Sequence, residues 1–488
     1  MIRRFGRRLF GDPDQPPLKL RRSAVALAKA EKVAPLLLFI VACAKHTPYV
    51  TPAVETTPTF KEDPNWKVAA PADSVLKGNW WEAFGDDQLN ALENQVAVSN
   101  QTLKSAEAQL LSARAAVRVA RAAFGPQVSA TPAIAFERQS ANRALSTFHD
   151  RYADFLLPVD VSYEADVWGR IRQTVNISEA NAQAVAADVQ SVSLSLHAEL
   201  ASDYFSLRGL DRERELLDNT VTAYQRALEL TTNRFRGGIA SAADVALAET
   251  QLETTRGQAV DVGVERASLE HAIAVLTGRQ AASFSLDSSP LDGTPPDVPP
   301  LVPSQLLERR PDIAGAERRV AAADAQVGLA KTAFYPVLSL SGTGGFETSS
   351  FGSLLAAASN FWAIGPSLAI NVFDSGRRRA ESTQARAEFT QATADYRETV
   401  LSAFREVEDQ LAALRILEQE ATIQEGAVAA AQRSLQLSTN RYRGGVVTYL
   451  EVITAQSAAL SNERTAVGIL VRRMNATVAL IKAIGGTW

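Results

Sequence analysis

Hydrophobic residues follow two spacings along this 488-residue chain, one helical and one alternating. Residues 171–233 and 377–443 contain no proline, and each predicts a helix roughly 90–100 Å long at 1.5 Å per residue. In the second segment, apolar residues step by four and three positions, as in a coiled-coil heptad. This seam comprises Val400, Phe404, Val407, Leu411 and Leu414.

The equivalent seam in the first long segment is more polar. It comprises Ser193, His197, Leu200, Tyr204 and Leu207. Because His197 occupies the position of Phe404, we expect it to be a packed seam residue rather than a metal ligand.

Four shorter segments alternate apolar and polar residues, which predicts strands. They are residues 127–137, 159–167, 337–346 and 361–373, and the polar connectors 138–154 and 347–360 make each pair a hairpin. Their lengths suit either a half-buried sheet of a soluble α+β protein or tilted transmembrane strands. Because four strands cannot close a barrel without free edges, the second interpretation requires several chains.

The chain is a tandem duplication. LELTTNRFRGGIA at 228–240 returns as LQLSTNRYRGGVV at 435–447, 207 residues later. The predicted helices 99–124 and 311–334 also match, 210 residues apart, and each ends just before a proline. Two blocks in the same order at nearly the same spacing indicate two repeated halves.

The repeated phrase falls where each long helix must end. Gly237-Gly238 and Gly444-Gly445 are expected to supply left-handed residues that reverse the chain. A second helix follows each time, at 241–277 and 448–484. Each phrase therefore predicts the tip of an antiparallel helical hairpin.

The N-terminal residues have the pattern of an export signal. Residues 1–42 carry nine Lys/Arg and three Asp/Glu, and the apolar run 33–43 is too short to span a bilayer as a helix. That run ends at Cys43, the only cysteine, in a context that resembles a bacterial lipobox. We therefore expect cleavage before Cys43, lipid attachment to it, and sorting to the outer membrane because Ala44 follows.

Charge and motif content exclude several function classes. Without residues 1–42 the formal net charge falls from −4 to −10, which disfavours a nucleic-acid partner. Four scattered histidines have no metal-ligand spacing, and no nucleophile elbow, phosphate loop or dinucleotide fingerprint is present. We therefore expect neither an enzyme nor a cofactor.

Two further motifs have structural explanations. The glycines of GTGGFE at 342–347 are expected in a strand that needs small residues, and Pro311 of RRPD is expected in the first turn of a helix.

Several ordered motifs together resemble the outer membrane factor family, the TolC-like channels of tripartite efflux systems, and in particular its lipoprotein branch. The resemblance covers nearly the whole mature chain. Its most specific stretches are NWWEAFGDDQLNAL (79–92), VDVSYEADVWGRIR (159–172), LLERRPDIAGAERRVAAADAQVGLAKTAFYPVLSLSG (306–342) and INVFDSGRRRAE (370–381).

The resemblance implies an α+β membrane protein that forms a homotrimer. Four strands per chain would then build a 12-stranded outer-membrane β-barrel, and the helices of three chains would form a long periplasmic coiled-coil barrel. The protein would be a passive exit duct for drugs or other small toxic compounds. Its partners would be a periplasmic adaptor protein and an inner-membrane pump of the RND type.

On this basis we expect nine segments. They are a signal peptide (1–42), an N-terminal tether and equatorial segment (43–95), a helix (96–125), β-hairpin 1 (126–168), a long helical hairpin (169–285), a Pro-rich equatorial linker (286–310), a helix (311–335), β-hairpin 2 (336–374), and a second long helical hairpin with the C-terminus (375–488).

The resemblance also assigns the tips. The residues expected to contact the adaptor are Arg234, Gly237, Gly238, Ile239, Arg441, Gly444, Gly445 and Val446. Asp244 and Glu451 match acidic residues that line the periplasmic constriction, and Tyr442 matches a tyrosine of the closed-state network. Alternatively, the two acids only stabilise helix N-termini. The family's gate arginine is Val447 here, so Arg441 and Arg443 either substitute for it or are solvated.

Two other functions remain open from the sequence. The outlet of a type I protein secretion system would share this architecture and differ in its partners. A coiled-coil structural lipoprotein without a pore would leave the four alternating strands unexplained.

Overall fold

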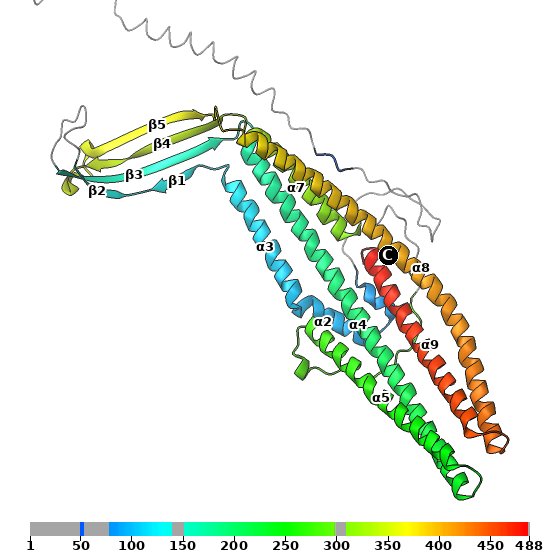
Figure 1. Cartoon of the computed structure of the whole chain (residues 1–488). Helices are drawn as coiled ribbons and strands as arrows, with labels where there is room; N and C mark the ends of the chain where they lie inside the picture. The colour runs from blue at the N-terminus through cyan, green and yellow to red at the C-terminus, as the bar shows by residue number, and fades with distance from the viewer. Residues whose placement is uncertain (1–48, 53–77, 139–150, 297, 299–308, 487–488) are drawn as a thin grey trace, which may run out of the picture. The chain divides into compact units, whose positions relative to one another are not determined.

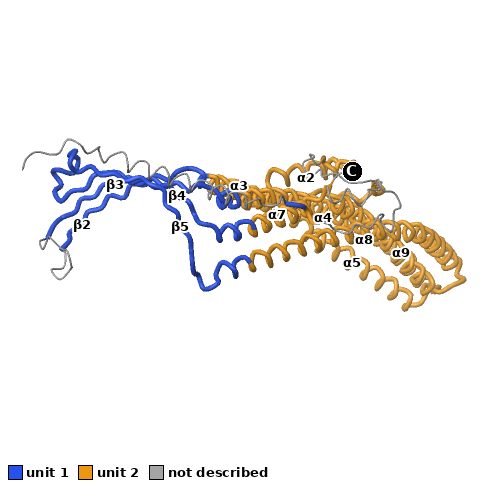
Figure 2. Tube along the Cα trace, turned by 90° about the horizontal axis from the view of Figure 1, so that it is seen from above, with its two compact units in different colours: residues 1–50, 122–174, 328–382 blue, residues 51–121, 175–327, 383–488 orange. Residues whose placement is uncertain are grey.

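The structure, a computed structural model, describes residues 49–52, 78–138, 151–296, 298 and 309–486. The expected signal peptide, Cys43 and most of the tether lie outside the described residues. The chain divides into two compact units (Figure 2). Unit 1 contains residues 122–174 and 328–382, and unit 2 contains residues 51–121, 175–327 and 383–488.

Unit 1 holds one antiparallel sheet, drawn in Figure 1. Its strands are β1 (Gln127–Ala130), β2 (Ala133–Arg138), β3 (Arg151–Ala165), β4 (Val337–Thr348) and β5 (Asn360–Ala369). The order is β1-β3-β4-β5, with β2 also paired to β3. The two predicted hairpins therefore join through β3 and β4.

β1 and β2 are two parts of one predicted strand. Gln127 pairs with Ser162 and Ala133 with Leu156, so both parts keep the same register along β3. The interruption falls at Pro132, which has no backbone N–H for the ladder. Four strand positions across the sheet are thus confirmed.

Two predicted strand limits are wrong. β3 begins at Arg151, eight residues before the predicted 159, because residues 151–156 pair with β2, and the ladder with β4 begins at Phe155. Pro158, which has no N–H to donate, pairs with Gly345 of β4 and lies opposite the interruption between β1 and β2. β5 ends at Ala369 rather than at 373.

The alternation places apolar and polar side chains on opposite faces of the sheet. Residues paired across an antiparallel ladder share a face. The apolar face carries Val128, Ile134, Phe136, Val159, Val161, Tyr163, Leu340, Trp362, Ile364 and Leu368, all of them exposed. The opposite face carries Ser129, Asp160, Ser162, Glu164, Ser339, Ser341, Thr343 and Ser367. Gly345 is needed in β4 because a Cβ there would lie 2.1 Å from the Leu157 carbonyl oxygen.

Unit 2 is helical. Its shorter helices are η1 (Trp80–Phe84), α2 (Asp87–Ser99), α3 (Gln101–Ala122), η2 (Ala281–Ser283) and α7 (Pro311–Thr332), and α7 starts at Pro311 as predicted. The long helices are α4 (Arg170–Arg236), α5 (Ala242–Leu276), α8 (Arg377–Arg443) and α9 (Tyr449–Ala483). In Figure 1 they run lengthwise through unit 2, and α5 of the first hairpin also contacts α9 of the second. Each hairpin consists of a 67-residue helix followed by a 35-residue helix, so the two halves of the duplication have long helices of equal length.

The predicted single helix 96–125 is wrong, because the chain breaks at Asn100. Asn100 has extended backbone, and its side chain accepts from the Leu103 N–H and donates to the Leu276 carbonyl. In the second half the guanidinium of Arg310 donates to the carbonyl of Ala483, the repeat equivalent of Leu276. Both halves thus tie the start of a short helix to the end of the hairpin's second helix.

The main hydrophobic core of unit 2 packs η1 and α2 against α4, α5 and α9. His197 lies in this core, stacked on Trp81 with ring centroids 4.5 Å apart, so its prediction as a packed residue is confirmed. Its partner Glu93 was not predicted. Glu93 is fully buried, and its carboxyl oxygen lies 2.6 Å from Nδ1 of His197.

Burial favours the neutral form of both members of this pair. It raises the pKa of Glu93 to about 9 and lowers the pKa of His197 to about 4. The 2.6 Å contact is therefore a hydrogen bond between a neutral carboxyl and a neutral imidazole.

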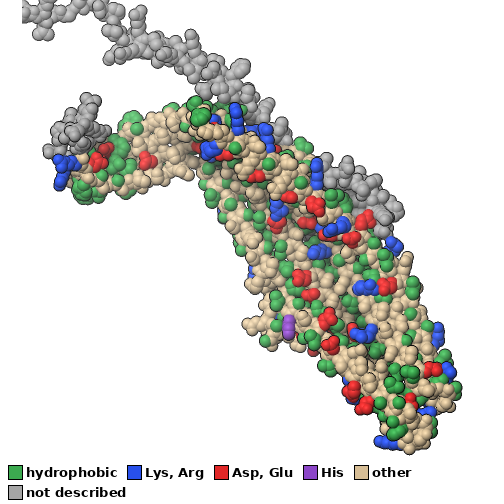
Figure 3. Space-filling model, viewed as in Figure 1, with side chains coloured by type: hydrophobic (Ala, Val, Ile, Leu, Met, Phe, Trp, Pro, Cys, Tyr) green, Lys and Arg blue, Asp and Glu red, His purple; other side chains and the backbone are tan. Residues whose placement is uncertain are grey.

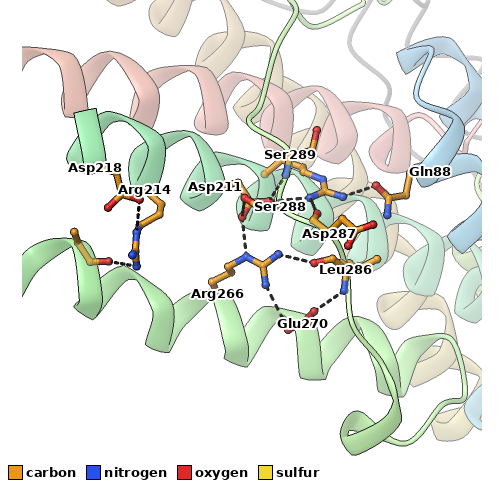
Figure 4. A network of polar contacts seen from close by, with 12 residues as sticks. Gln88, Asp211, Arg214, Asp218, Arg266, Glu270, Leu286, Asp287, Ser288 and Ser289 are labelled. Atoms are coloured by element: carbon orange, nitrogen blue, oxygen red, sulfur yellow. Dashed lines mark hydrogen bonds and ion pairs between the residues drawn. The ribbon is translucent and has the colours of Figure 1, made fainter. Parts of the chain in front are cut away.

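A second buried polar cluster fastens the segment that follows η2 (Figure 4). Asp211 accepts hydrogen bonds from Arg208, Arg266, the Ser288 hydroxyl and the Ser289 N–H. Burial alone would raise the pKa of Asp211, but these donors hold it below its ordinary value. The first part of the predicted equatorial linker is thereby fixed to α4 and α5.

Candidate functional site: the two hairpin tips

The two tips have nearly the same backbone. α4 ends at Arg236 and α8 at Arg443, and Gly238 (φ 75°) and Gly445 (φ 76°) adopt the left-handed conformation. The Ile239 N–H bonds the Arg234 carbonyl at 2.8 Å, and the Val446 N–H bonds the Arg441 carbonyl at 3.0 Å. These are the helix-closing bonds of a glycine C-cap.

Each Gly-Gly pair supplies a left-handed residue as predicted, and in both pairs it is the second glycine. Gly237 and Gly444 keep negative φ, and a Cβ on either would meet its nearest carbonyl oxygens at 3.5 Å, an ordinary contact. The turn therefore requires glycine only at the second position of each pair.

At the first tip, Asp244 closes the start of α5. The Ser241 hydroxyl accepts from the Asp244 N–H at 3.1 Å, and the Asp244 carboxylate accepts from the Ser241 N–H and hydroxyl, each at 2.9 Å. This is a complete capping box. The carboxylate thus has the helix-stabilising role that the sequence left as the alternative to a gate.

At the second tip, the acid at the same helical position has different partners. Thr448 caps α9 without a side-chain hydrogen bond. Glu451 instead accepts from the guanidinium of Arg441 on α8 at 2.7 Å and from the Ser438 hydroxyl at 3.4 Å. Arg441 is therefore an ion-pair partner within its own hairpin.

Arg234 joins the two tips to each other. Its guanidinium donates to the carbonyl oxygen of Arg443 at 3.0 Å and lies 4.7 Å from the ring centre of Tyr442. The Tyr442 hydroxyl donates to Thr231 Oγ1 of α4 at 3.3 Å. Two side chains, one from each tip, thus cross between the hairpins.

Tyr442 and Phe235 are repeat equivalents with opposite environments. Tyr442 is 4% exposed and packs in a small core with Ala248, Tyr449 and Val452, whereas Phe235 is 45% exposed. At this position only the second tip has a hydroxyl group, and only there is the aromatic side chain buried.

Ile239 and Val446, the residues after the turns, are each 70% exposed, so both turns present an apolar side chain to solvent.

The predicted site residues therefore form two sets. Tyr442, Arg234 and Arg443 lie together across the hairpins, and Glu451 lies with Arg441, but Asp244 bonds Ser241 instead of joining them. Thr231 was not predicted, although the repeat places another buried hydroxyl residue, Ser438, at the matching position.

The rest of the described chain offers little other chemistry. Among the described residues no group of three or more His, Cys, Asp or Glu side chains could hold a metal ion. No helix in the described ranges is long and apolar enough to cross a membrane. On the face shown in Figure 3, acidic and basic side chains are interspersed over the helices.

Comparison with solved structures defines the class of protein. The chain superposes on the outer-membrane channel OprN with a TM-score of 0.82 at 29% identity, over 91% of this chain and 100% of that one. A crystal structure of CusC aligns with a TM-score of 0.81 at 25% identity, over 91% and 100% of the two chains. The fold is that of the TolC-like outer-membrane channels.

Sequence comparison gives the family. The profile of the outer membrane efflux protein family matches residues 92–279 and again 302–486, and the chain belongs to this family. The toluene efflux pump outer membrane protein TtgC of Pseudomonas putida is 29% identical over 453 residues, 91% of this chain and 93% of the relative. The cation efflux system protein CusC of Escherichia coli is 27% identical over 477 residues, 96% and 99% of the two chains.

Proposed function

We propose that this chain forms a homotrimeric exit duct in the outer membrane, the last part of a tripartite efflux system. The observation that carries the proposal is the two-faced sheet of unit 1. One face is exposed and apolar across all four strand positions, and the other is polar. Such a sheet suits lipid on one side and water on the other.

The free edges of the sheet support association of several chains. β1 and β2 form one edge and β5 the other. A bilayer does not tolerate unpaired strand edges, so the edges must pair with those of other copies. Three copies of four strand positions give a barrel of 12.

Anchoring and partners follow from the family and the N-terminal sequence. Lipid on Cys43 would hold the start of the mature chain at the outer membrane, and the helices of unit 2 would extend into the periplasm. The relatives include outer-membrane parts of pumps named for toluene and for cations, so the duct itself sets no narrow substrate class. An adaptor and an RND-type inner-membrane pump would supply the substrate.

The tips supply the proposed gate and adaptor contact. Ile239 and Val446 are exposed apolar residues beside the glycine turns, suited to contact an adaptor. Tyr442 and Arg234 hold the two hairpins together, while Asp244 and Glu451 place carboxylates near the start of α5 and α9. In a trimer these acids would form a ring that favours cations.

Planar-bilayer recordings test the proposal directly. The purified protein should run as a trimer on sizing in detergent and form water-filled, cation-preferring channels. A protein that stays helical but never conducts would instead be a structural coiled-coil lipoprotein. A monomer in every detergent tested would also contradict the duct.

A further inference from the structure

Two arginines lie directly opposite each other at the connector end of the sheet, where β2 leads to β3 and β4 leads to β5 (Figure 1). Arg138, the last residue of β2, pairs with Arg151, the first residue of β3, and both side chains are exposed. Directly paired side chains have Cβ atoms about 4.5–5.5 Å apart, and like charges at this distance destabilise a sheet. An anion bound between the two guanidinium groups would remove this repulsion.

The arginine pair belongs to the apolar face of the sheet. Side chains alternate between the two faces along a strand, so Arg138 shares a face with Ile134 and Phe136. Ile134 is 64% exposed and Phe136 is 83% exposed. Arginine on the lipid side of a barrel strand is costly in the middle of a bilayer and costs little near its interface. The pair therefore suits the level at which the apolar face meets lipid headgroups.

Positive and negative charges are separated at this end of the sheet. On the described strands, Arg138 and Arg151 are the only charged residues of the apolar face. The nearby carboxylates, those of Glu137, Asp154 and Glu347, lie on the polar face. The lipid-facing side of this end is therefore complementary to an anion, and the carboxylates are on the other side of the sheet.

The apolar face has the length of one bilayer crossing. Residues 153–163 of β3 rise about 33 Å along the strand, or about 25 Å across a bilayer at a tilt of about 40°. This is the height of the apolar band of outer-membrane barrels. β3 and β5 lead into α4 and α8 at the other end of the sheet. The proposed duct, with its helices in the periplasm, therefore has the arginine pair at the interface of the outer leaflet.

Exposed aromatic side chains lie on the apolar face near the arginines. Phe351 of η3 (Phe351–Ser353) packs edge-on against Phe155, with ring centroids 5.6 Å apart. Phe155 pairs with Ile134 and so belongs to the apolar face. Phe351 is 71% exposed, and Leu355 of the same connector is 72% exposed. The surface beside the arginines is thus suited to contact acyl chains.

We propose that Arg138 and Arg151 bind a phosphate group of lipid A, the phosphorylated glycolipid anchor of lipopolysaccharide, whose acyl chains lie against Phe136 and Phe351. A phosphate monoester carries about −1.5 to −2 charges, which matches two arginines better than the single charge of a phospholipid phosphodiester. Guanidinium forks bind phosphate oxygens bidentately. The proposal rests on the proposed duct, since it needs the sheet in the outer membrane, and extends it by one lipid site in each copy.

Native mass spectrometry of the purified trimer, titrated with defined lipids, tests the site. The unmodified trimer should bind up to three molecules of lipid A. Arg138→Gln with Arg151→Gln should weaken this binding by about tenfold or more for each arginine lost. Lipid A without its phosphates should bind the unmodified trimer as weakly as intact lipid A binds the double variant.

The matched control is Arg172→Gln, at the start of α4. Arg172 is also an exposed arginine of unit 1, with its side chain 66% exposed and 3.7 Å from Asp166. This variant should bind lipid A as tightly as the unmodified trimer. An equal loss of binding in the control would overturn the assignment to the arginine pair.

Thermal dissociation of the trimer separates lipid binding from a structural role of the arginines. In detergent without lipid A, Arg151→Gln should be at least as stable as the unmodified trimer, because the substitution removes a repulsion. Added lipid A should raise the dissociation temperature of the unmodified trimer and scarcely that of the double variant. A variant that dissociates earlier without lipid A would show a structural role and overturn the site.

The remaining contrary results are separable from failure of the duct. Equal binding of lipid A by the unmodified trimer and the double variant would overturn the site. Arginine-dependent binding of phosphatidylglycerol that is as tight as that of lipid A would overturn lipid A as the occupant. In both cases a trimer that conducts leaves the duct intact, whereas a protein that forms neither trimers nor channels would overturn both proposals.

Discussion

The two halves of the chain fold to helices of equal length but bury different polar groups. At equivalent junctions the first half uses Asn100, a neutral amide, and the second uses Arg310, a guanidinium that is 7% exposed. In the seam, His197 with Glu93 stands where the second half has Phe404. The long helices therefore have the same lengths in both halves, whereas the buried side chains that stabilise them differ.

The junction residues should give the largest difference between the halves. Arg310→Ala removes bonds to the Ala483 carbonyl, to Glu406 at 2.8 Å and to Asp312 at 2.7 Å. We expect a loss of about 2–3 kcal/mol in the free energy of unfolding, because buried hydrogen bonds of a charged group are lost while the carboxylates left behind are partly exposed. Asn100→Ala should cost about 1–2 kcal/mol, since it loses a cap and one buried hydrogen bond.

Both losses of stability can be measured by urea unfolding, monitored through the circular-dichroism signal of the helices. Arg310→Lys serves as the conservative control, since it keeps the charge but cannot reach three partners at once. Equal losses at the two junctions would contradict the ranking.

The buried pair should make the first half sensitive to alkaline pH. Folded, the pair keeps one proton between about pH 4 and about pH 9; unfolded, Glu93 and His197 return to pKa values of 4.5 and 6.5. Above pH 6.5 the unfolded chain has released a proton that the folded chain still holds. Stability should therefore fall as pH rises from about 6.5 to about 9, by about 1.4 kcal/mol per pH unit.

The second half supplies the control for this prediction. His197→Phe with Glu93→Leu copies the apolar seam at Phe404 and should abolish that slope in thermal unfolding scans. A slope that survives in the double variant would assign the pH dependence to other groups.

The sequence predicts the helices and strand positions well because they depend on periodicity and on glycine and proline. It misses the break at Asn100, since asparagine is tolerated inside a helix. The break is stabilised by a hydrogen bond from the Asn100 side chain to the carbonyl of Leu276, which is distant in sequence. It misses Glu93 for the same reason. A glutamate within a helical segment looks solvated until the fold buries it against His197.

The tips should respond unequally to loss of matched arginines. Arg234→Ala removes the contacts to Tyr442 and to the Arg443 carbonyl, and should loosen the tips by about 1–2 kcal/mol. Arg441→Ala removes only a solvent-accessible ion pair with Glu451, worth about 0.5 kcal/mol. Hydrogen exchange of residues 228–240 and 435–447 should accelerate in both segments for the first variant and scarcely for the second.

The smallest expected effect separates capping from gating at Asp244. Asp244→Asn and Ser241→Ala both weaken the capping box and should each cost about 1 kcal/mol or less in stability. Only Asp244→Asn removes charge, so only it should lower cation preference in planar bilayers if the carboxylates line the constriction. Glu451→Gln should add to that loss, and Asp244→Ala with Glu451→Ala should raise single-channel conductance. If Asp244→Asn and Ser241→Ala behave alike in selectivity, Asp244 is a helix cap alone, and the two tips differ in function as well as in contacts.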